Sequence, residues 1–197
     1  MHAYIIFAHP SHRSFSHAVL ERFTSGVRGA GHTFEITDLY ATNFRSEMDE
    51  AQYLRETGPD PDAPVPEDVR EEQRKIGGAD ALVFIFPVWW SDCPAKLKGW
   101  FDRVLTFGYA YFYDDADQRR TKITTKKALV LCSAGHTVEH LEEIKVAEAM
   151  RTILLGDRLL GVGVKEARLE IRGGMMPGKN EYRQQNLARA YQLGREF

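Results

Sequence analysis

Short apolar runs alternate along the chain with segments of helical periodicity, and this alternation constrains the fold more than any other feature. The runs that predict strands cover residues 3–8, 33–37, 81–86, 128–132 and 164–171. The segments that predict helices cover residues 16–28, 67–76, 94–106, 138–155 and 180–197, with a short helix at 47–55 inside a polar excursion from 38 to 66. Strands that alternate with helices need crossover connections, which favour a parallel sheet covered on both faces. We predict one α/β domain over residues 1–197, a three-layer sandwich with five parallel strands in the order 2-1-3-4-5.

Composition and charge exclude several classes of protein. The 197 residues carry a formal net charge of -2, which gives no basic surface for nucleic acid. Cys93 and Cys132 lie far apart and form no CxxC pair, so we expect reduced thiols and a reducing compartment. No apolar run approaches the roughly 20 residues that span a bilayer. The first residues have no basic segment or cleavage site and are interpreted as a strand. We therefore expect a cytoplasmic protein without membrane insertion.

The predicted topology places the functional site. In a doubly wound sheet the ligand binds beyond the carboxyl ends of the strands, where the strand order reverses between strands 1 and 3. Three loops reach this position: residues 9–16, residues 87–94 and residues 133–140. A functional ligand is expected to contact all three.

The first loop opens a helix and carries three hydroxyl side chains. Ser11, Ser14 and Ser16 lie beside the cation Arg13 and the imidazole of His9, which is a second possible cation. Free N–H groups at a helix N-terminus, together with hydroxyls and positive charge, favour binding of a phosphate group. The alternative is an N-capped helix whose polar residues are only solvated. No GxxxxGK[ST] pattern is present, so nucleoside triphosphate hydrolysis has no support.

The second and third loops favour a planar ligand. Trp89 and Trp90 are adjacent in a loop, where an exposed aromatic pair is costly unless something flat packs against it. An isoalloxazine ring is such a ligand; a hydrophobic plug or a dimer contact is the alternative. The third loop begins with the small residues Ser133, Ala134 and Gly135, which let the backbone approach a ligand closely.

Three segments carry a family resemblance. They are AHPSHRSFS in the first loop, DLYATNF at 38–44, and FPVWWSDCPAKLKGWFDRVLTFGYAY at 86–111. The chain resembles the flavodoxin-like NAD(P)H dehydrogenase (quinone) family, which includes mammalian quinone reductases and bacterial flavoproteins ancillary to potassium efflux. The resemblance runs from the first strand to about residue 140 and is weak in the last quarter of the chain.

The resemblance implies a flavodoxin-like fold, a homodimer and a bound flavin. It implies hydride transfer from NAD(P)H to the flavin and then two-electron reduction of a quinone-like acceptor, in a ping-pong mechanism. We expect FMN, with FAD as the alternative, because no segment is clearly suited to adenine. The family's isoalloxazine contacts correspond to Pro87, Val88, Trp89, Trp90, Ser133, Ala134 and Gly135. Its flavin phosphate contacts correspond to His9, Ser14, Phe15 and Ser16, and the aromatic residues of its acceptor pocket to Tyr109, Tyr111 and Tyr113.

The third loop departs from the family pattern. Many members have two threonines and two glycines after strand 4, then a tyrosine and later a histidine that are assigned a charge or proton relay. Here Ser-Ala-Gly-His occupies that place and no tyrosine follows. We expect His136, or else His140, to supply the catalytic donor, since an imidazole donates hydrogen bonds and titrates near neutrality. The alternative is that both histidines are solvated and that the N–H group of Gly135 suffices.

Two other functions compete with that of a flavin enzyme. Residues 136–140 match the H-x-x-E-H pattern of inverted zinc peptidases. This pattern lies in a strand-to-helix loop of a chain much shorter than those enzymes, so we predict no metal site. The second alternative is a flavin-bound regulatory partner of a membrane transporter with little turnover of its own.

Overall fold

One parallel sheet organises the computed structural model, which describes residues 1–176 and 180–197. Its strands are β1 (His2–Phe7), β2 (Thr33–Asp38), β3 (Ala81–Pro87), β6 (Lys127–Ser133) and β7 (Glu166–Arg172). They lie in the order β2-β1-β3-β6-β7 and all pair in parallel. This confirms the predicted order 2-1-3-4-5. A separate antiparallel pair, β4 (Phe112–Tyr113) with β5 (Arg119–Arg120), was not predicted.

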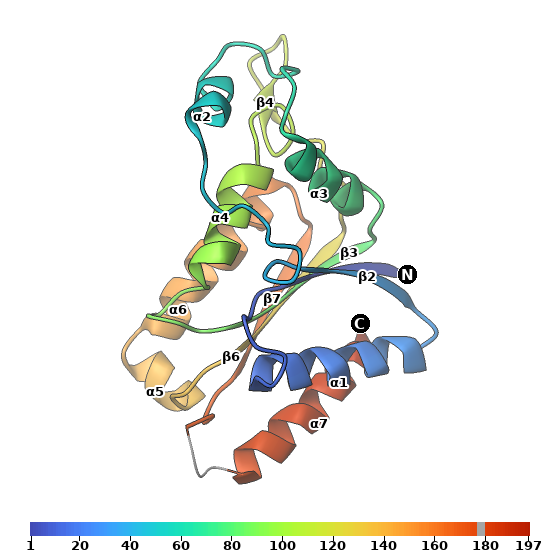
Figure 1. Ribbon diagram of the computed structural model, residues 1–197, viewed down its shortest axis with the longest axis vertical. Coiled ribbons are helices and arrows are strands. Elements are labelled where there is room, and N and C mark those ends of the chain that lie inside the picture. Colours follow the sequence, from blue (N-terminus) through green and yellow to red (C-terminus); the bar gives the residue numbers. More distant parts are fainter. Residues whose placement is uncertain (177–179) are drawn as a thin grey trace.

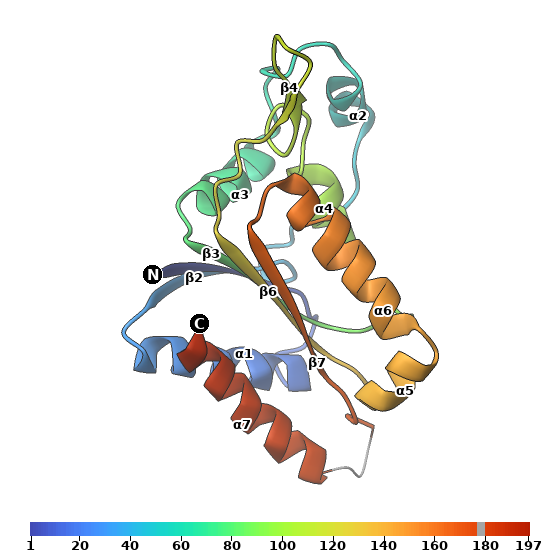
Figure 2. The ribbon, with the colours of Figure 1, turned by 180° about the vertical axis from the view of Figure 1, so that it is seen from behind.

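Helices cover both faces of the sheet (Figures 1 and 2). One face is covered by α1 (Phe15–Gly29) and α7 (Asn180–Glu196). The other is covered by α3 (Glu67–Gly77), α4 (Ala95–Val104), α5 (Val138–Glu143) and α6 (Val146–Met150). The short α2 (Glu50–Glu56) lies beside β4 at the top of both views, beyond the sheet.

Burial explains why the sheet forms between two helical layers. All seven residues of β3 are buried, as expected for a central parallel strand. On one face Phe23 packs in a cluster with α7, where the helices approach so closely that a Cβ at Gly26 would lie 2.2 Å from the carbonyl oxygen of Tyr191. On the other face the ring of Trp100 meets Phe84 edge-on at 5.7 Å. These apolar clusters make the sheet a fixed base for the loops at its carboxyl edge.

Two predicted helices differ in detail from the structure. The helix predicted over 138–155 is interrupted at Lys145, which has a φ of +64°. It continues through α6 into a π-helix at Arg151–Asp157 and is followed by a 3₁₀ turn at Leu160–Val162. The helix predicted at 47–55 begins later because Asp49 caps it, accepting a hydrogen bond from the Gln52 N–H at 2.8 Å.

The excursion between β2 and α3 is fastened to α4 by buried polar contacts. The Arg103 guanidinium is fully buried, ion-pairs with Asp68 and donates from Nε to the Gln52 side chain at 2.9 Å. Gln52 in turn donates to the carbonyl oxygen of Arg103 at 2.9 Å. A buried charge with its partners in place fixes the segment to which it belongs. Over residues 1–176 and 180–197, no helix combines the length and the apolar character needed to cross a membrane.

Candidate functional site

The three predicted loops converge at the carboxyl edge of the sheet. The hydroxyl of Ser16, in the first turn of α1, lies 2.9 Å from that of Ser133, the last residue of β6. The N–H of Val88, which follows β3, donates to the carbonyl oxygen of Ser133 at 2.7 Å. One residue of the third loop therefore contacts both of the others, and the site residues predicted from three distant segments lie together.

The first loop ends in a well-formed helix N-terminus. Ser14 is the N-cap of α1, and its hydroxyl accepts from the N–H of His17 at 3.1 Å. The N–H groups of Phe15 and Ser16 precede the first helical hydrogen bonds and have no acceptor in the part of the chain that the structure describes. Two free N–H groups at the positive end of a 15-residue helix can bind a phosphate oxygen.

His9 accepts a hydrogen bond in this loop as a neutral ring rather than a cation. Its Nδ1 accepts from the N–H of Ser11 at 3.0 Å, which assigns the ring proton to Nε2. Partial burial lowers the pKa of His9 below its ordinary value, because desolvation disfavours the charged ring. The positive charge that the sequence suggested at this position is therefore replaced by a neutral imidazole, while Arg13 is exposed.

The second loop makes a tight turn of four residues, Trp89 to Asp92, named here the tryptophan turn. The Trp89 N–H donates to the carbonyl oxygen of Asp92 at 3.0 Å, and the Asp92 N–H donates back at 3.2 Å. Trp90 and Ser91 both have left-handed φ angles, 47° and 68°. The Trp90 side chain is fully exposed, and the Trp89 ring lies edge-on to the ring of His9 at 5.7 Å between centroids. The turn thus presents aromatic surface beside the first loop.

The third loop extends the pairing of β6 with β7. The Ala134 N–H donates to the carbonyl oxygen of Arg172 at 3.0 Å, the Met175 N–H to that of Ala134 at 3.0 Å, and the Gly174 N–H to that of His136 at 2.8 Å. Ser133 and Ala134 are buried, whereas Gly135 is exposed. The exposed glycine leaves its backbone open to a ligand.

The two predicted catalytic histidines lie side by side. The rings of His136 and His140 are 4.7 Å apart, and both side chains are exposed. With Gly135 they line a hollow that Gly174, Met176 and Tyr182 complete. Within the described residues no three histidine, cysteine or acidic side chains are placed to bind a metal ion.

Neither cysteine has the environment of a reactive thiol. Burial raises the pKa of Cys93 to about 12, and burial raises that of Cys132 to about 12 as well. A thiol reacts as its thiolate, so both are packing residues near neutral pH.

The predicted acceptor-pocket tyrosines lie away from the three loops. Tyr109 donates to the carbonyl oxygen of Gln73 at 3.1 Å, and burial raises its pKa. Tyr111 packs against Phe107 at 5.5 Å between ring centroids. Tyr113 belongs to β4 and is 56% exposed. Figures 1 and 2 place β4 at the end of the molecule opposite α5, so one chain does not bring these tyrosines to the loop site.

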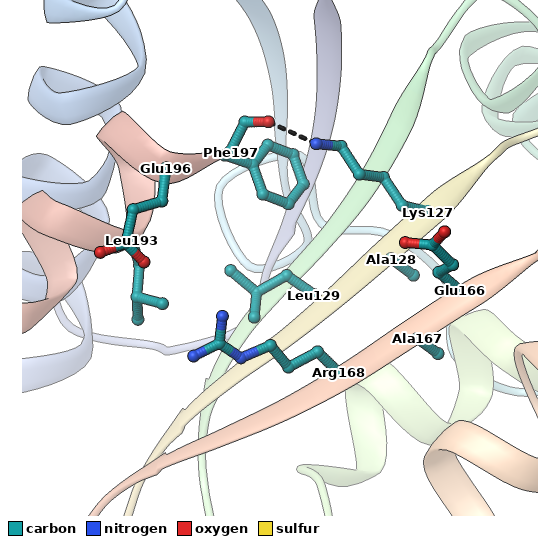
Figure 3. Close-up of a pocket in the computed structure, with 9 residues that line it drawn as sticks. All are labelled: Lys127, Ala128, Leu129, Glu166, Ala167, Arg168, Leu193, Glu196 and Phe197. Atoms are coloured by element: carbon teal, nitrogen blue, oxygen red, sulfur yellow. Dashed lines mark hydrogen bonds between the residues drawn. The ribbon is translucent and has the colours of Figure 1, made fainter.

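A further pocket lies at the opposite edge of the sheet. Its lining comes from the first residues of β6 and β7 and from the end of α7, and Lys127 donates to the carbonyl oxygen of Phe197 there (Figure 3). None of the predicted site residues lines this pocket. The residues of the three predicted loops lie instead at the carboxyl edge, which is therefore taken as the candidate site.

Sequence reasoning missed two contributors to the site. Arg158 follows the π-helix and approaches the carboxylate of Asp92 at 3.4 Å. The segment from Arg172 to Met175 supplies backbone partners to the third loop. Neither has a motif of its own, because each acts through a contact that only the tertiary structure creates.

Comparisons with known proteins agree with this arrangement. Residues 1–192 match the family model described as a flavodoxin-like fold. An NAD(P)H:quinone oxidoreductase from Methanothermobacter marburgensis is 61% identical with a TM-score of 0.95, covering 100% of this chain and 96% of that chain. NAD(P)H dehydrogenase [quinone] 1 of Cavia porcellus is 34% identical over 146 residues, which are 68% of this chain and 53% of that protein.

A more distant structure shares the fold. An FMN-dependent NADH-azoreductase from Bacillus anthracis, in complex with FMN, is 17% identical with a TM-score of 0.74 and covers 99% of this chain and 98% of that chain. The chain spans about half to two thirds of the length of several curated relatives that it matches. The family model and the 61% identical neighbour decide the assignment: the chain belongs to the flavodoxin-like fold family, with NAD(P)H:quinone oxidoreductases among its relatives.

Proposed function

We propose that this chain is a flavin-dependent oxidoreductase that takes electrons from NAD(P)H and gives them to quinone-like acceptors. The observation that carries the proposal is the convergence of the three loops through Ser133, at the position where this topology binds ligands. The 61% identical neighbour is an NAD(P)H:quinone oxidoreductase, which supports the same reaction class. When bound, the flavin supplies the two-electron chemistry, with hydride from the nicotinamide and release to the acceptor in successive half-reactions.

The residues present fit the two ends of a flavin. The N-terminus of α1, with the N–H groups of Phe15 and Ser16, the hydroxyl of Ser14 and the Nε2 of His9, would bind the phosphate. Trp89 and the exposed backbone at Gly135 would contact the isoalloxazine ring. Pro87, Val88, Trp90, Ser133 and Ala134 would complete these contacts, as the family resemblance implies.

The exposed histidines of the third loop would stabilise charge at the pyrimidine end of the ring. His136 directly follows Gly135, the glycine whose backbone is open to the ligand. We assign His136 the donor role and His140 a supporting one, since their rings lie 4.7 Å apart. A preorganised donor aimed at developing negative charge lowers the barrier of the step that creates the charge.

FMN is the proposed flavin, and a second copy of the chain completes the acceptor pocket. The sequence has no segment clearly suited to adenine, which favours FMN over FAD. Tyr113 belongs to β4, which lies at the end of the molecule opposite α5, and Tyr109 and Tyr111 directly precede this strand in the chain. In a two-fold dimer they would line the acceptor pocket of the partner's site.

Cofactor release tests the proposal. The purified protein, reconstituted with excess FMN or FAD and desalted, should be yellow and release one flavin per chain on denaturation, identified by spectrum and mass. NADPH or NADH should bleach the holoprotein, and a benzoquinone should restore its colour. A protein that retains neither flavin would contradict the proposal. Stable flavin without quinone-dependent turnover would instead favour the regulatory role.

A further inference from the structure

The tryptophan turn has an unusual backbone that requires support from outside it. Trp90 and Ser91 occupy the left-handed region in succession, although neither is glycine. Such angles are disfavoured for residues with a Cβ and persist where surrounding contacts fix them. The turn itself contributes two backbone hydrogen bonds, between Trp89 and Asp92, to holding this conformation.

Arg158 supplies contacts from outside the turn. Its guanidinium approaches both oxygens of the Asp92 carboxylate, with Nη2 at 3.4 Å from Oδ2 and Nη1 at 3.5 Å from Oδ1. The Arg158 side chain is 11% exposed, and its Cζ lies 5.1 Å from the ring centroid of Phe101. The same Asp92 carboxylate accepts from the N–H of Cys93 at 2.7 Å. Asp92 thus joins the turn, the start of α4 and Arg158.

Arg158 directly follows a π-helix. The N–H of Arg158 donates to the carbonyl oxygen of Ile153 at 3.0 Å, the five-residue spacing of a π-helix. The wider spacing changes the direction of side chains that follow it, and such segments recur at functional sites. Arg151, at the start of the same segment, instead pairs with Glu142 on the exposed surface.

We propose that Arg158 is the positioning residue of the tryptophan turn. Its pair with Asp92 keeps Trp89 and the turn's backbone where they can contact the flavin ring. Trp89 depends on this geometry because its ring lies against His9 and its backbone pairs with Asp92. The effect on flavin binding rests on the proposed function, whereas the effect on the turn itself does not.

The test uses Arg158→Met, which keeps an apolar stem, Asp92→Asn, and the double variant. Arg158→Lys tests rescue by charge, and Arg151→Met is the matched control for loss of an arginine from the same segment. The protein contains three tryptophans, so 5-fluorotryptophan labelling gives three ¹⁹F signals that Trp→Phe variants assign. Trp100, buried and bonded to Glu72, is the internal reference.

In flavin-free protein, Arg158→Met and Asp92→Asn should shift or broaden the signals of Trp89 and Trp90 and leave that of Trp100 in place. The Kd for FMN should rise about tenfold, because a turn that is no longer held in place must be ordered when the flavin binds. The double variant should be no worse than either single one, Arg158→Lys should recover part of the loss, and Arg151→Met should match wild type.

Unchanged signals of Trp89 and Trp90 in both single variants would overturn the proposal, as would altered signals with an unchanged Kd for FMN. Wild-type protein that binds no flavin would contradict the proposed function alone, because the ¹⁹F signals still report on the turn. If Arg158→Met does not fold, Arg158→Lys and Asp92→Asn decide by the same criteria.

Discussion

The hydroxyls of Ser16 and Ser133 lie 2.9 Å apart and are buried, although the two serines are 117 positions apart in the chain. This contact joins the first turn of α1 to the end of β6. Since the N–H of Val88 also donates to the carbonyl oxygen of Ser133, the contact belongs to a junction shared by all three loops. The predictions that follow concern three properties of the candidate site: its stability, its charge and its completion by a second subunit.

The first prediction concerns the serine pair. Ser16→Ala or Ser133→Ala should each lower the free energy of unfolding by about 1–3 kcal/mol, because each leaves one buried hydroxyl without its partner. The double alanine variant should lose less than the two single effects added, since no orphaned hydroxyl remains. Urea unfolding of the four proteins measures this coupling. Additive losses would show that the hydroxyls do not stabilise each other.

The second prediction concerns the two exposed histidines. His136→Ala should slow reduction of the bound flavin by NADPH on the order of tenfold or more, the low end of a lost general-acid or electrostatic contribution. His140→Ala should have a smaller effect, because His140 lies beside His136 and is one helical turn farther from Gly135. Stopped-flow absorbance measures both rates, and flavin content should stay intact. Wild-type rates in both variants would assign the role to the Gly135 backbone.

The strand order and the convergence of the loops could be predicted because they follow from local patterns and general topology. The apolar run at Ala81–Pro87 has only one environment that suits it, a central strand buried on both faces. Once the five strands are assigned, the crossover rules place their carboxyl ends together. The positions of Ser16, Val88 and Ser133 at one edge follow without knowledge of any side-chain contact.

The rest depends on contacts between distant residues. The π-helix at Arg151–Asp157 has no sequence pattern that separates it from an α-helix, so the Arg158 contact with Asp92 could not be predicted. The neutral state of His9 depends on its burial, which the sequence does not report. Residues 177–179 lie outside the described part of the chain, in the segment predicted to connect the last strand and helix.

The third prediction concerns pH and His9. Burial lowers the pKa of His9 below its ordinary value of 6.5, so the unfolded chain binds this proton at a higher pH than the folded chain does. The contribution of neutral His9 to stability is therefore complete above pH 6.5 and is lost as the pH falls below that value. His9→Asn, which keeps an acceptor for the N–H of Ser11, should show a weaker loss of stability between pH 7 and 5 than wild type.

Urea unfolding at several pH values measures this difference, and an NMR titration of the His9 ring gives its pKa directly. His12→Asn is the matched control, since it replaces an exposed imidazole of the same loop. A His9 pKa above 6.5 in the flavin-free protein would contradict the prediction.

The last prediction concerns the second subunit. Tyr113 belongs to β4, at the end of the molecule opposite α5, and Tyr109 and Tyr111 directly precede this strand in the chain, whereas the three loops of the candidate site follow the carboxyl ends of their strands. If the tyrosines serve the partner's site, the chain must be dimeric at micromolar concentration, which sedimentation measures. The aromatic surface at Tyr113, which is 56% exposed, is then part of the reason why the dimer forms.

Subunit complementation separates this arrangement from a pocket built within one chain. Tyr113→Ala should raise the KM for the quinone with flavin content unchanged, and a variant with Ser14→Ala and Trp89→Ala should lose flavin. In a mixed dimer, the subunit that retains flavin carries Tyr113→Ala but receives an intact Tyr113 from its partner. One of the two sites in such a mixed dimer is therefore complete and should show the wild-type KM, whereas the other site holds no flavin. Mixed dimers, purified with two affinity tags, that keep the high KM of Tyr113→Ala would place the tyrosines outside the acceptor pocket.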